Sequence, residues 1–364
     1  MDAFPVIALG IAELTRLGGV ILVLPLMLPV VGLLVGLLLA PIGLGRQLGR
    51  FVLLLTLAGL AAALAIAAVL LSTGDSLSYQ LGGWSPPLGV SLKADGLSAV
   101  MLVTSAVVML AVGLYGQQAF RVPVGERETR SSLVFWLLLL GVWSGLNTVV
   151  LGQDLFTLFV ALELLTFSAV PLVALSGQPE TLASALRYLL FALLGSALYL
   201  LGAVLFYGTY GTLDIALLAD QIAGEAQLPP PVIAAVALMT VGLMAKTALF
   251  PLHLWLPPAH SGAPPAASAI LSALVVKGSF FLIVRLWFDL MRGLLLLPGV
   301  ELLGAMGAAA ILFGNLLALR QARLKLLIAY STLAQIGYLF LLFPLAVVPR
   351  ASASSALPRL ACRS

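Results

Sequence analysis

The sequence predicts an all-α polytopic membrane protein, and three observations lead to this fold class. Hydrophobic residues make up 62% of the 364 residues, and charged residues make up only 9%. A soluble domain carries roughly 25% charged residues, so the charge is too sparse for a water-exposed surface. Several apolar segments also reach the length of about 20 residues that a bilayer crossing requires. We therefore expect one bundle of about ten transmembrane helices in a lipid bilayer, over residues 1–349.

The expected helices follow one another with short connections. Their ranges are 20–40, 51–71, 96–118, 132–152, 154–176, 182–208, 232–256, 266–288, 300–319 and 325–347. The fourth and fifth ranges nearly touch, which predicts a tight turn at residues 152–154. Pro251 lies within the seventh range, and a proline breaks the helix that carries it. We expect the seventh helix to be broken at Pro251.

Basic residues in the connections predict the orientation. With the N-terminus outside, the inner connections hold Arg46, Arg50, Arg121, Arg127, Arg130, Arg187, Arg320, Arg323 and Lys325. The outer segments before the tail hold Arg16, Lys93 and Arg292. Cytoplasmic loops carry an excess of Lys and Arg. We expect a multi-pass protein of the inner (cytoplasmic) cell membrane with its N-terminus outside. The same bias accounts for the net charge of +4, so no nucleic-acid partner is expected.

The last residues, 350–364, are small, polar and basic, with no helical or strand periodicity. This composition is typical of a disordered tail. It is also what a truncated or frame-shifted gene product would show. We favour an out-of-frame tail after a bundle that is truncated at its C-terminus.

Several kinds of cofactor site are not expected. The sequence has no G-x-x-x-x-G-K-[ST] phosphate loop and no G-x-G-x-x-G fingerprint after a strand. His253 and His260 are the only histidines, and the single cysteine is Cys362. Neither histidine has a Cys or carboxylate nearby in the sequence to complete a zinc site. We expect no metal, no cofactor and no redox chemistry in this chain itself.

Glu163 is the first ionisable residue that points to chemistry within the membrane. It lies nine residues after Asp154, which is about 13 Å along a helix at 1.5 Å per residue. This depth is close to the middle of the bilayer. A carboxylate there is by default a functional hypothesis. The alternative is a protonated glutamate that is hydrogen-bonded within the bundle.

Lys246 lies fifteen residues into the seventh range and five residues before Pro251. A lysine at a helix centre costs about 2.5–3.5 kcal/mol on insertion scales. A broken helix frees backbone carbonyls, which is tolerated at this depth only within protein or beside water. Broken helices mark ion paths in many transporters. The alternative for Lys246 is snorkelling to the interface, which its depth and Pro251 disfavour.

Four further ionisable groups follow. Lys277 lies about eleven residues into the eighth range, which favours a functional role. His253 and His260 flank the helix break, and each is either a proton relay or a satisfied core histidine. Arg285 lies nearer the end of its range, where snorkelling explains it as well as function does.

These residues also carry a family resemblance. The segment Lys246-Thr-Ala-Leu-Phe-Pro-Leu-His-Leu-Trp-Leu-Pro-Pro-Ala-His-Ser-Gly-Ala-Pro-Pro resembles a signature of the antiporter-like membrane subunits of respiratory complex I. The same signature occurs in multisubunit monovalent cation/proton antiporters and membrane-bound hydrogenases. Other similar motifs are Asp95-Gly-Leu-Ser, Asp154-Leu-Phe-Thr-Leu-Phe with Glu163, and Lys325-Leu-Leu-Ile-Ala-Tyr-Ser. Gly83-Trp-Ser-Pro-Pro-Leu-Gly-Val is more similar to the D-type antiporter subunit. The resemblance covers about residues 80–345.

The resemblance implies a larger architecture than this chain contains. Family members have about fourteen helices with two inverted five-helix repeats. The first repeat carries a glutamate, a lysine on a broken helix and a second lysine, which match Glu163, Lys246 and Lys277. The second repeat has its own broken helix, and this chain stops before it. The chain therefore resembles the first two-thirds of such a subunit, and we do not expect a complete trans-membrane path within it.

The functional hypothesis joins these observations. It is a proton-translocating membrane subunit of an NADH:quinone oxidoreductase-like complex, with a proton path through Glu163, Lys246, Lys277, His253 and His260. Other membrane subunits would supply the driving force, and whether the complex is an enzyme stays open. One alternative is the D-type subunit of a multisubunit monovalent cation/proton antiporter, which moves protons and Na+. Another is a structural bundle in which the charges only pair, and a lone solute transporter is weaker still.

Overall fold

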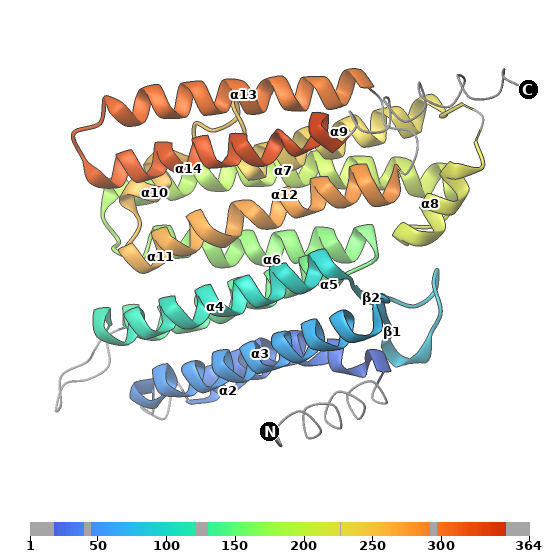
Figure 1. Cartoon of the computed structure of the whole chain (residues 1–364). Helices are drawn as coiled ribbons and strands as arrows, with labels where there is room; N and C mark the ends of the chain where they lie inside the picture. The colour runs from blue at the N-terminus through green and yellow to red at the C-terminus, as the bar shows by residue number, and fades with distance from the viewer. Residues whose placement is uncertain (1–17, 40–44, 121–129, 226, 292–296, 347–364) are drawn as a thin grey trace, which may run out of the picture.

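The computed structural model describes residues 18–39, 45–120, 130–225, 227–291 and 297–346. Within these residues, ten helices are long and apolar enough to cross a membrane. They run side by side along one common direction (Figure 1). The predicted fold class, an all-α polytopic bundle, is confirmed. The predicted tail at 350–364 lies outside the described residues.

The first five membrane helices match the predicted ranges closely. The elements are η1 (Gly18–Val23) with α2 (Leu24–Leu39), α3 (Gly45–Thr73), α4 (Gly96–Ala119), α5 (Arg130–Leu151) and α6 (Leu155–Val173). Only residues 152–154 separate α5 from α6, which confirms the predicted tight turn. Asp154 caps α6 by accepting the backbone N–H of Thr157 at 2.8 Å.

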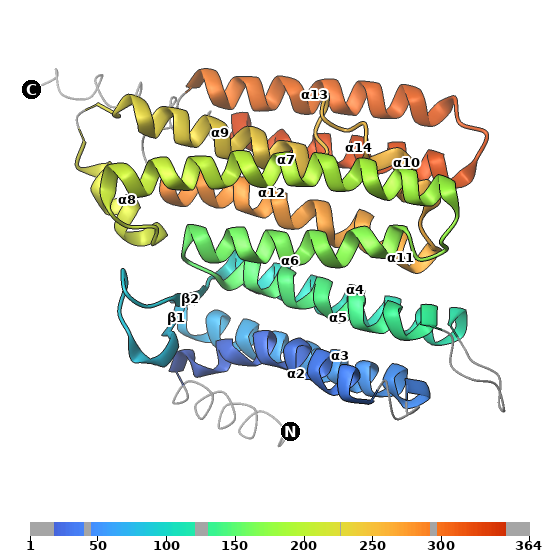
Figure 2. The ribbon, with the colours of Figure 1, turned by 180° about the vertical axis from the view of Figure 1, so that it is seen from behind.

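The second half of the described chain contains longer and less regular elements. They are α7 (Pro179–Tyr210), α8 (Ile215–Ala223), α9 (Pro230–Thr247), α10 (Leu256–Gly262), α11 (Pro265–Ile270), η3 (Leu271–Val275), α12 (Val276–Arg285), η4 (Leu286–Leu290), α13 (Leu297–Leu319) and α14 (Leu324–Phe340). In both ribbon views, α2 and α3 lie along one edge of the bundle and α13 lies along the opposite edge (Figures 1 and 2). Helices α6, α7, α9 and α12 therefore lie towards the middle.

A small antiparallel hairpin joins α3 to α4 and was not predicted. Strand β1 (Leu77–Gln80) pairs with β2 (Ser91–Ala94), with Leu77 opposite Ala94, and η2 (Leu81–Gly83) follows β1. Four residues are too few for a strand pattern to stand out in an apolar sequence. The hairpin and α8 lie at the same end of the bundle (Figure 1).

The seventh helix is broken, but earlier than predicted. Helix α9 ends at Thr247, and Ala248 adopts the left-handed conformation with φ 59° and ψ 38°. The predicted range 232–256 is therefore not one helix, because residues 248–255 separate α9 from α10. A proline disfavours the helical region for the residue before it, so a helix ends ahead of the proline itself. The carbonyl of Ala245 accepts the indole N–H of Trp255 at 2.9 Å and the backbone N–H of Ala248 at 3.3 Å.

The eighth membrane helix is irregular at both ends of α12. The flanking segments η3 and η4 are each five-residue π-helical turns. Such turns are rare and are found frequently at functional sites. Helix α12 is consequently a ten-residue α-helical rod, with Lys277 in its first turn and Arg285 at its end.

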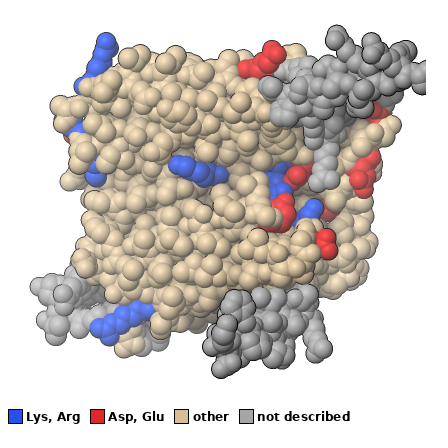
Figure 3. Space-filling model, in the orientation of Figure 1, with Lys and Arg blue, Asp and Glu red and all other residues tan. Residues whose placement is uncertain are grey.

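The outer surface of the bundle is apolar. Large hydrophobic side chains such as Leu38, Leu71 and Leu319 are exposed. One face of the molecule shows a broad surface without charged side chains, and most of its charged side chains lie near the ends (Figure 3). A soluble monomer rarely exposes so large an apolar surface to water, whereas the hydrocarbon core of a bilayer can surround it. The protein is therefore a multi-pass membrane protein.

Candidate functional site

Lys246 and Glu163 form an ion pair in the interior of the bundle. Lys246 lies in the last turn of α9 and is 5% exposed, and Glu163 lies on α6 and is 17% exposed. The Nζ atom of Lys246 is 3.5 Å from the Oε1 atom of Glu163. The structure thus brings together two of the residues that the sequence singles out. Burial of either charge without a partner would be costly.

Two hydroxyl groups complete the immediate surroundings of this pair. Thr166 lies one helical turn after Glu163 on α6, and its Oγ1 accepts a hydrogen bond from Lys246 Nζ at 2.8 Å. The same hydroxyl donates to the carbonyl of Leu162 at 2.8 Å. On α7, the hydroxyl of Ser196 donates to Glu163 Oε1. Sequence reasoning missed both residues, although the i,i+3 spacing of Glu163 and Thr166 was a readable signal.

A small cavity adjoins the Lys246 side chain. Its volume is about 10 Å³, and Leu162, Leu165, Thr166, Tyr188, Ala192, Lys246, Val275 and Ser279 line it. This space is close to the minimum for one water molecule, which needs polar partners. Thr166, Lys246 and Ser279 supply polar groups on its wall. We call it the Lys246 cavity.

Lys277 lies apart from the ion pair. Its Nζ donates to the carbonyl of Ser272, within the π-helical turn η3. The hydroxyl of Ser272 is in turn 2.9 Å from Thr332 Oγ1 on α14. Within the described chain, Lys277 makes no hydrogen bond or ion pair with Glu163 or Lys246. Its side chain is half-buried.

Both histidines are buried near the helix break. His253 stacks on Phe250 with ring centroids 5.4 Å apart, and its Nδ1 has no hydrogen-bond partner within the described residues. His260 Nδ1 is 2.6 Å from Ser268 Oγ, and its Nε2 likewise has no hydrogen-bond partner in that part of the chain. Lys277 and Lys325 are within electrostatic range of His260. Each histidine therefore retains one ring nitrogen that could exchange a proton.

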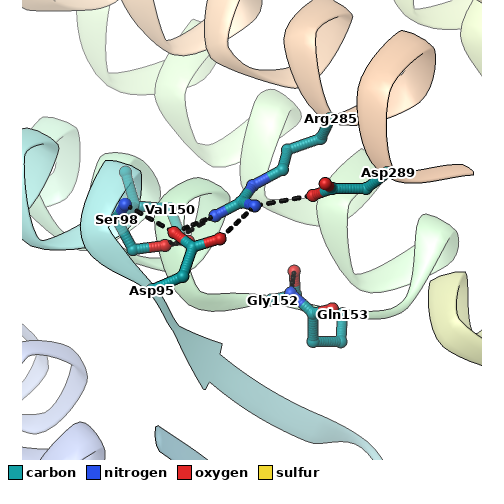
Figure 4. Close-up of polar contacts among 7 residues, drawn as sticks. All are labelled: Asp95, Ser98, Val150, Gly152, Gln153, Arg285 and Asp289. Atoms are coloured by element: carbon teal, nitrogen blue, oxygen red, sulfur yellow. Dashed lines mark hydrogen bonds and ion pairs between the residues drawn. The ribbon is translucent and has the colours of Figure 1, made fainter. Parts of the chain in front are cut away.

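Arg285 does not snorkel, and it forms a second charged site that sequence reasoning missed. Its guanidinium makes two hydrogen bonds to Asp95, at 2.5 and 2.7 Å, and one to Asp289 at 2.6 Å (Figure 4). It also donates to Ser98 Oγ at 2.8 Å. The sequence signals were the i,i+4 spacing of Arg285 and Asp289 and the motif that begins at Asp95. We call Asp95, Arg285 and Asp289 the Arg285 cluster.

The Arg285 cluster joins three parts of the bundle. Asp95 caps α4 by accepting the backbone N–H of Ser98 at 2.9 Å, and the Ser98 hydroxyl donates to Val150 O on α5 at 3.2 Å. Burial raises the pKa of Asp95, but the hydrogen bonds from Arg285 and Ser98 and the charge of Arg285 outweigh it and lower the pKa to about 2. Asp95 is therefore ionised at neutral pH.

The fold and the interior site define a class of protein. It is a polytopic membrane protein in which a buried carboxylate–ammonium pair adjoins a broken helix, an arrangement found in proteins that move ions across membranes. In the described part of the chain, no group of three or more His, Cys, Asp or Glu side chains could hold a metal ion. The absence of a metal or cofactor in the whole chain stays a prediction.

Comparisons with known proteins identify the family. Residues 152–354 match the family described as NADH:quinone oxidoreductase/Mrp antiporter, transmembrane. The N subunit of NADH-quinone oxidoreductase from Desulforudis audaxviator is 36% identical over 292 residues, which are 80% of this chain and 57% of that protein. The D-type subunit of the Na(+)/H(+) antiporter from Bacillus subtilis is 31% identical over 287 residues, or 77% of this chain and 55% of that protein.

A solved structure agrees with these relatives. A chain of the membrane-bound sulfane sulfur reductase, an archaeal respiratory membrane complex, matches with a TM-score of 0.81 and 30% identity. The match covers 89% of this chain and 64% of that chain. This protein belongs to the NADH:quinone oxidoreductase/Mrp antiporter family of membrane subunits, as the motif resemblance predicts. It spans about half the length of the curated relatives it matches.

Proposed function

We propose that this chain is a proton-translocating membrane subunit in which Glu163 and Lys246 carry the proton. The observation that supports this most directly is the ion pair beside the break in α9, with Nζ 3.5 Å from Oε1. A purely structural pair would not need to lie where a helix is interrupted. A small cavity adjoins the pair at this place, and irregular backbone at membrane depth is tolerated where it is buried in protein or lines water.

The proposed chemistry depends on the distance between the two charges. Coulomb attraction stabilises the ammonium form of Lys246 when Glu163 is close, and separation removes that stabilisation. A movement that lengthens the contact therefore lets Lys246 release its proton. Thr166 and Ser196 provide hydroxyl partners that hold each group after the pair separates. Water in the Lys246 cavity would accept the released proton.

The remainder of the path is proposed from Lys277 and the two histidines. Ser279 lines the Lys246 cavity and lies on α12, the helix that carries Lys277. His260 lies within electrostatic range of Lys277, and His253 lies at the break itself. A proton would pass from Lys246 through water to Lys277 and then among these groups. This step requires motion, since Lys277 is bonded to Ser272 rather than to the ion pair.

We place the subunit in a multisubunit complex of the inner (cytoplasmic) cell membrane, with its N-terminus outside. The relative with the higher identity belongs to NADH-quinone oxidoreductase, which favours a redox-driven complex similar to complex I. A second candidate is a D-type subunit of a cation/proton antiporter, which the Bacillus subtilis relative favours. In either complex, partner membrane subunits would supply the driving force through coupled conformational change.

The test replaces Lys246 with arginine in the assembled complex. Arginine keeps the positive charge but cannot be deprotonated in a protein. We expect Lys246→Arg to assemble and to lower proton translocation in proteoliposomes by about 100-fold or more, because proton transfer by a positioned group contributes about that factor. The matched control is Lys93→Arg, a lysine on β2 outside the ion pair.

Normal pumping by Lys246→Arg would refute the proposed role of Lys246.

Two results with the wild-type complex distinguish the redox-driven candidate from the antiporter candidate. If the wild-type complex pumps with NADH and quinone and needs no Na+ gradient, the redox-driven candidate holds. If a Na+ gradient alone drives proton movement, the antiporter candidate holds.

A further inference from the structure

A second small cavity lies along the same helices as the Lys246 cavity. Its volume is also about 10 Å³, and its lining includes Leu158, Tyr199, Ile215, Met239, Leu282 and Arg285. Helices α6, α7 and α9 and the eighth membrane helix contribute to both cavities. We call this the Arg285 cavity.

The two cavities follow one another along a single seam between these four elements. On α6, the wall residue Leu158 of the Arg285 cavity is four residues from Leu162 of the Lys246 cavity, which is about 6 Å along the helix. On α12, Leu282 and Ser279 are three residues apart, which is about 4.5 Å. The nearest walls of the two cavities are therefore about one helical turn apart.

Arg285 occupies the end of this seam that is nearer the hairpin and α8. Its side chain borders the Arg285 cavity, while its guanidinium turns to Asp95, Ser98 and Asp289 (Figure 4). The side chains of Asp95 and Asp289 are 30% and 28% exposed, so the cluster reaches the molecular surface. Two hydrogen bonds to Asp95 and one to Asp289 hold the guanidinium in one position at this end of the seam, so the side chain is placed to block a narrow passage by its bulk.

We propose that Arg285, held by Asp95 and Asp289, seals the outer end of this seam and keeps outer water and cations from Lys246. The purpose of the seal rests on the proposed function, since a coupled pump fails when its proton site opens to both sides at once. The seal itself does not require transport to be observed. It assigns to the Arg285 cluster a role that the proton path does not use.

The test measures whether a thiol reagent that is added on the outer side of the membrane reaches the seam. In a Cys362→Ser background, which removes the only cysteine, Leu158→Cys places a thiol in the Arg285 cavity. A small, positively charged methanethiosulfonate is added to the outer side of right-side-out membrane vesicles. With Arg285 intact, we expect little labelling. With Arg285→Gln, we expect labelling to accelerate by about tenfold or more, the factor that corresponds to about 1.4 kcal/mol in an opening equilibrium.

Two further variants guard against loss of folding. Arg285→Gln leaves Asp95 buried without its partner, whereas Asp95→Asn/Arg285→Gln removes both charges and is expected to be better tolerated. The double variant should also label quickly. The matched control is Asp220→Asn, which removes a carboxylate on α8 outside the Arg285 cluster and should label as slowly as the parent. Size-exclusion profiles and melting temperatures establish that each labelled variant is folded.

The outcomes separate the seal from the proton path. Fast labelling of Leu158→Cys with the Arg285 cluster intact would overturn the seal. Slow labelling in both folded variants that lack Arg285 would also overturn it. Normal pumping by Lys246→Arg would refute the proton path instead, and would leave the labelling result unchanged.

Discussion

At the scale of single residues, the buried charges differ in how they are compensated. Lys246 has a hydroxyl at 2.8 Å and a carboxylate oxygen at 3.5 Å, so its closest polar contact is a neutral group. Arg285 has two carboxylates at hydrogen-bond distance. Charge-assisted bidentate contacts are the stronger kind. This difference supports the two proposals, that Lys246 separates from its carboxylate during proton transfer and that Arg285 stays in place as a seal.

The pH dependence of the Arg285 cluster follows from Asp95. Its pKa in the folded protein is about 2, below its ordinary value of 3.8. A lowered carboxyl pKa contributes stability that is fully present above about pH 4 and is lost as the pH falls through 2. We expect the melting temperature of wild type in detergent to exceed that of Asp95→Asn by a constant margin from pH 5 to pH 8. The margin should shrink only below pH 4, and a margin that disappears near pH 6 would contradict the assigned ion pair.

At the scale of elements, the contact between α7 and α9 positions Lys246. A Cβ atom on Gly242 would come within 2.3 Å of the carbonyl oxygen of Gly195, and one on Gly195 would come within 2.6 Å of Gly242 O. The Cβ atom on Gly195 would also lie 3.1 Å from Lys246 Cγ. Small residues let membrane helices approach closely. The two glycines therefore determine how near Ser196 on α7 can come to the ion pair.

The Gly242→Ala variant tests this contact. The added methyl group must push α7 and α9 apart, and overpacking of this kind costs about 1–3 kcal/mol. We expect a lower melting temperature and reduced proton translocation. Gly208→Ala is the control on α7, because a Cβ atom there meets nothing within 4 Å. Alanine is also the better helix former, so that variant should be at least as stable as wild type. Equal stability of the two variants would show that the contact is not tight.

At the scale of the whole molecule, the structural alternative for the ion pair makes a different prediction from the proton path. If Glu163 and Lys246 only lock α6 to α9, removing both charges should be tolerated better than removing one, because no charge is left buried alone. We expect Glu163→Gln/Lys246→Met to melt at or above the temperature of either single variant. On our proposal it should nevertheless translocate no protons in the reconstituted complex. Substantial pumping by this double variant would support the structural alternative.

Much of the architecture could be predicted from the sequence, because the bilayer imposes simple physical requirements. A membrane helix must be long, apolar and internally hydrogen-bonded, so ten ranges, the turn at 152–154 and an interruption near Pro251 were readable from residue order. The same requirement makes Glu163, Lys246 and Lys277 conspicuous, since charges in an apolar segment are rare. The family motifs at Lys246 and Asp154 added the likeness that the comparisons confirm.

The sequence alone determined that this is a helical membrane subunit of the NADH:quinone oxidoreductase/Mrp antiporter family with ionisable groups in its interior. Only the tertiary structure decided which of these groups meet. It paired Lys246 with Glu163, placed Lys277 on Ser272 instead, and joined Arg285 to Asp95 from 190 residues away. Such pairings depend on helix rotation and packing distance between elements far apart in the chain. Hydropathy records how deep a residue lies in the membrane, but not which neighbour it faces.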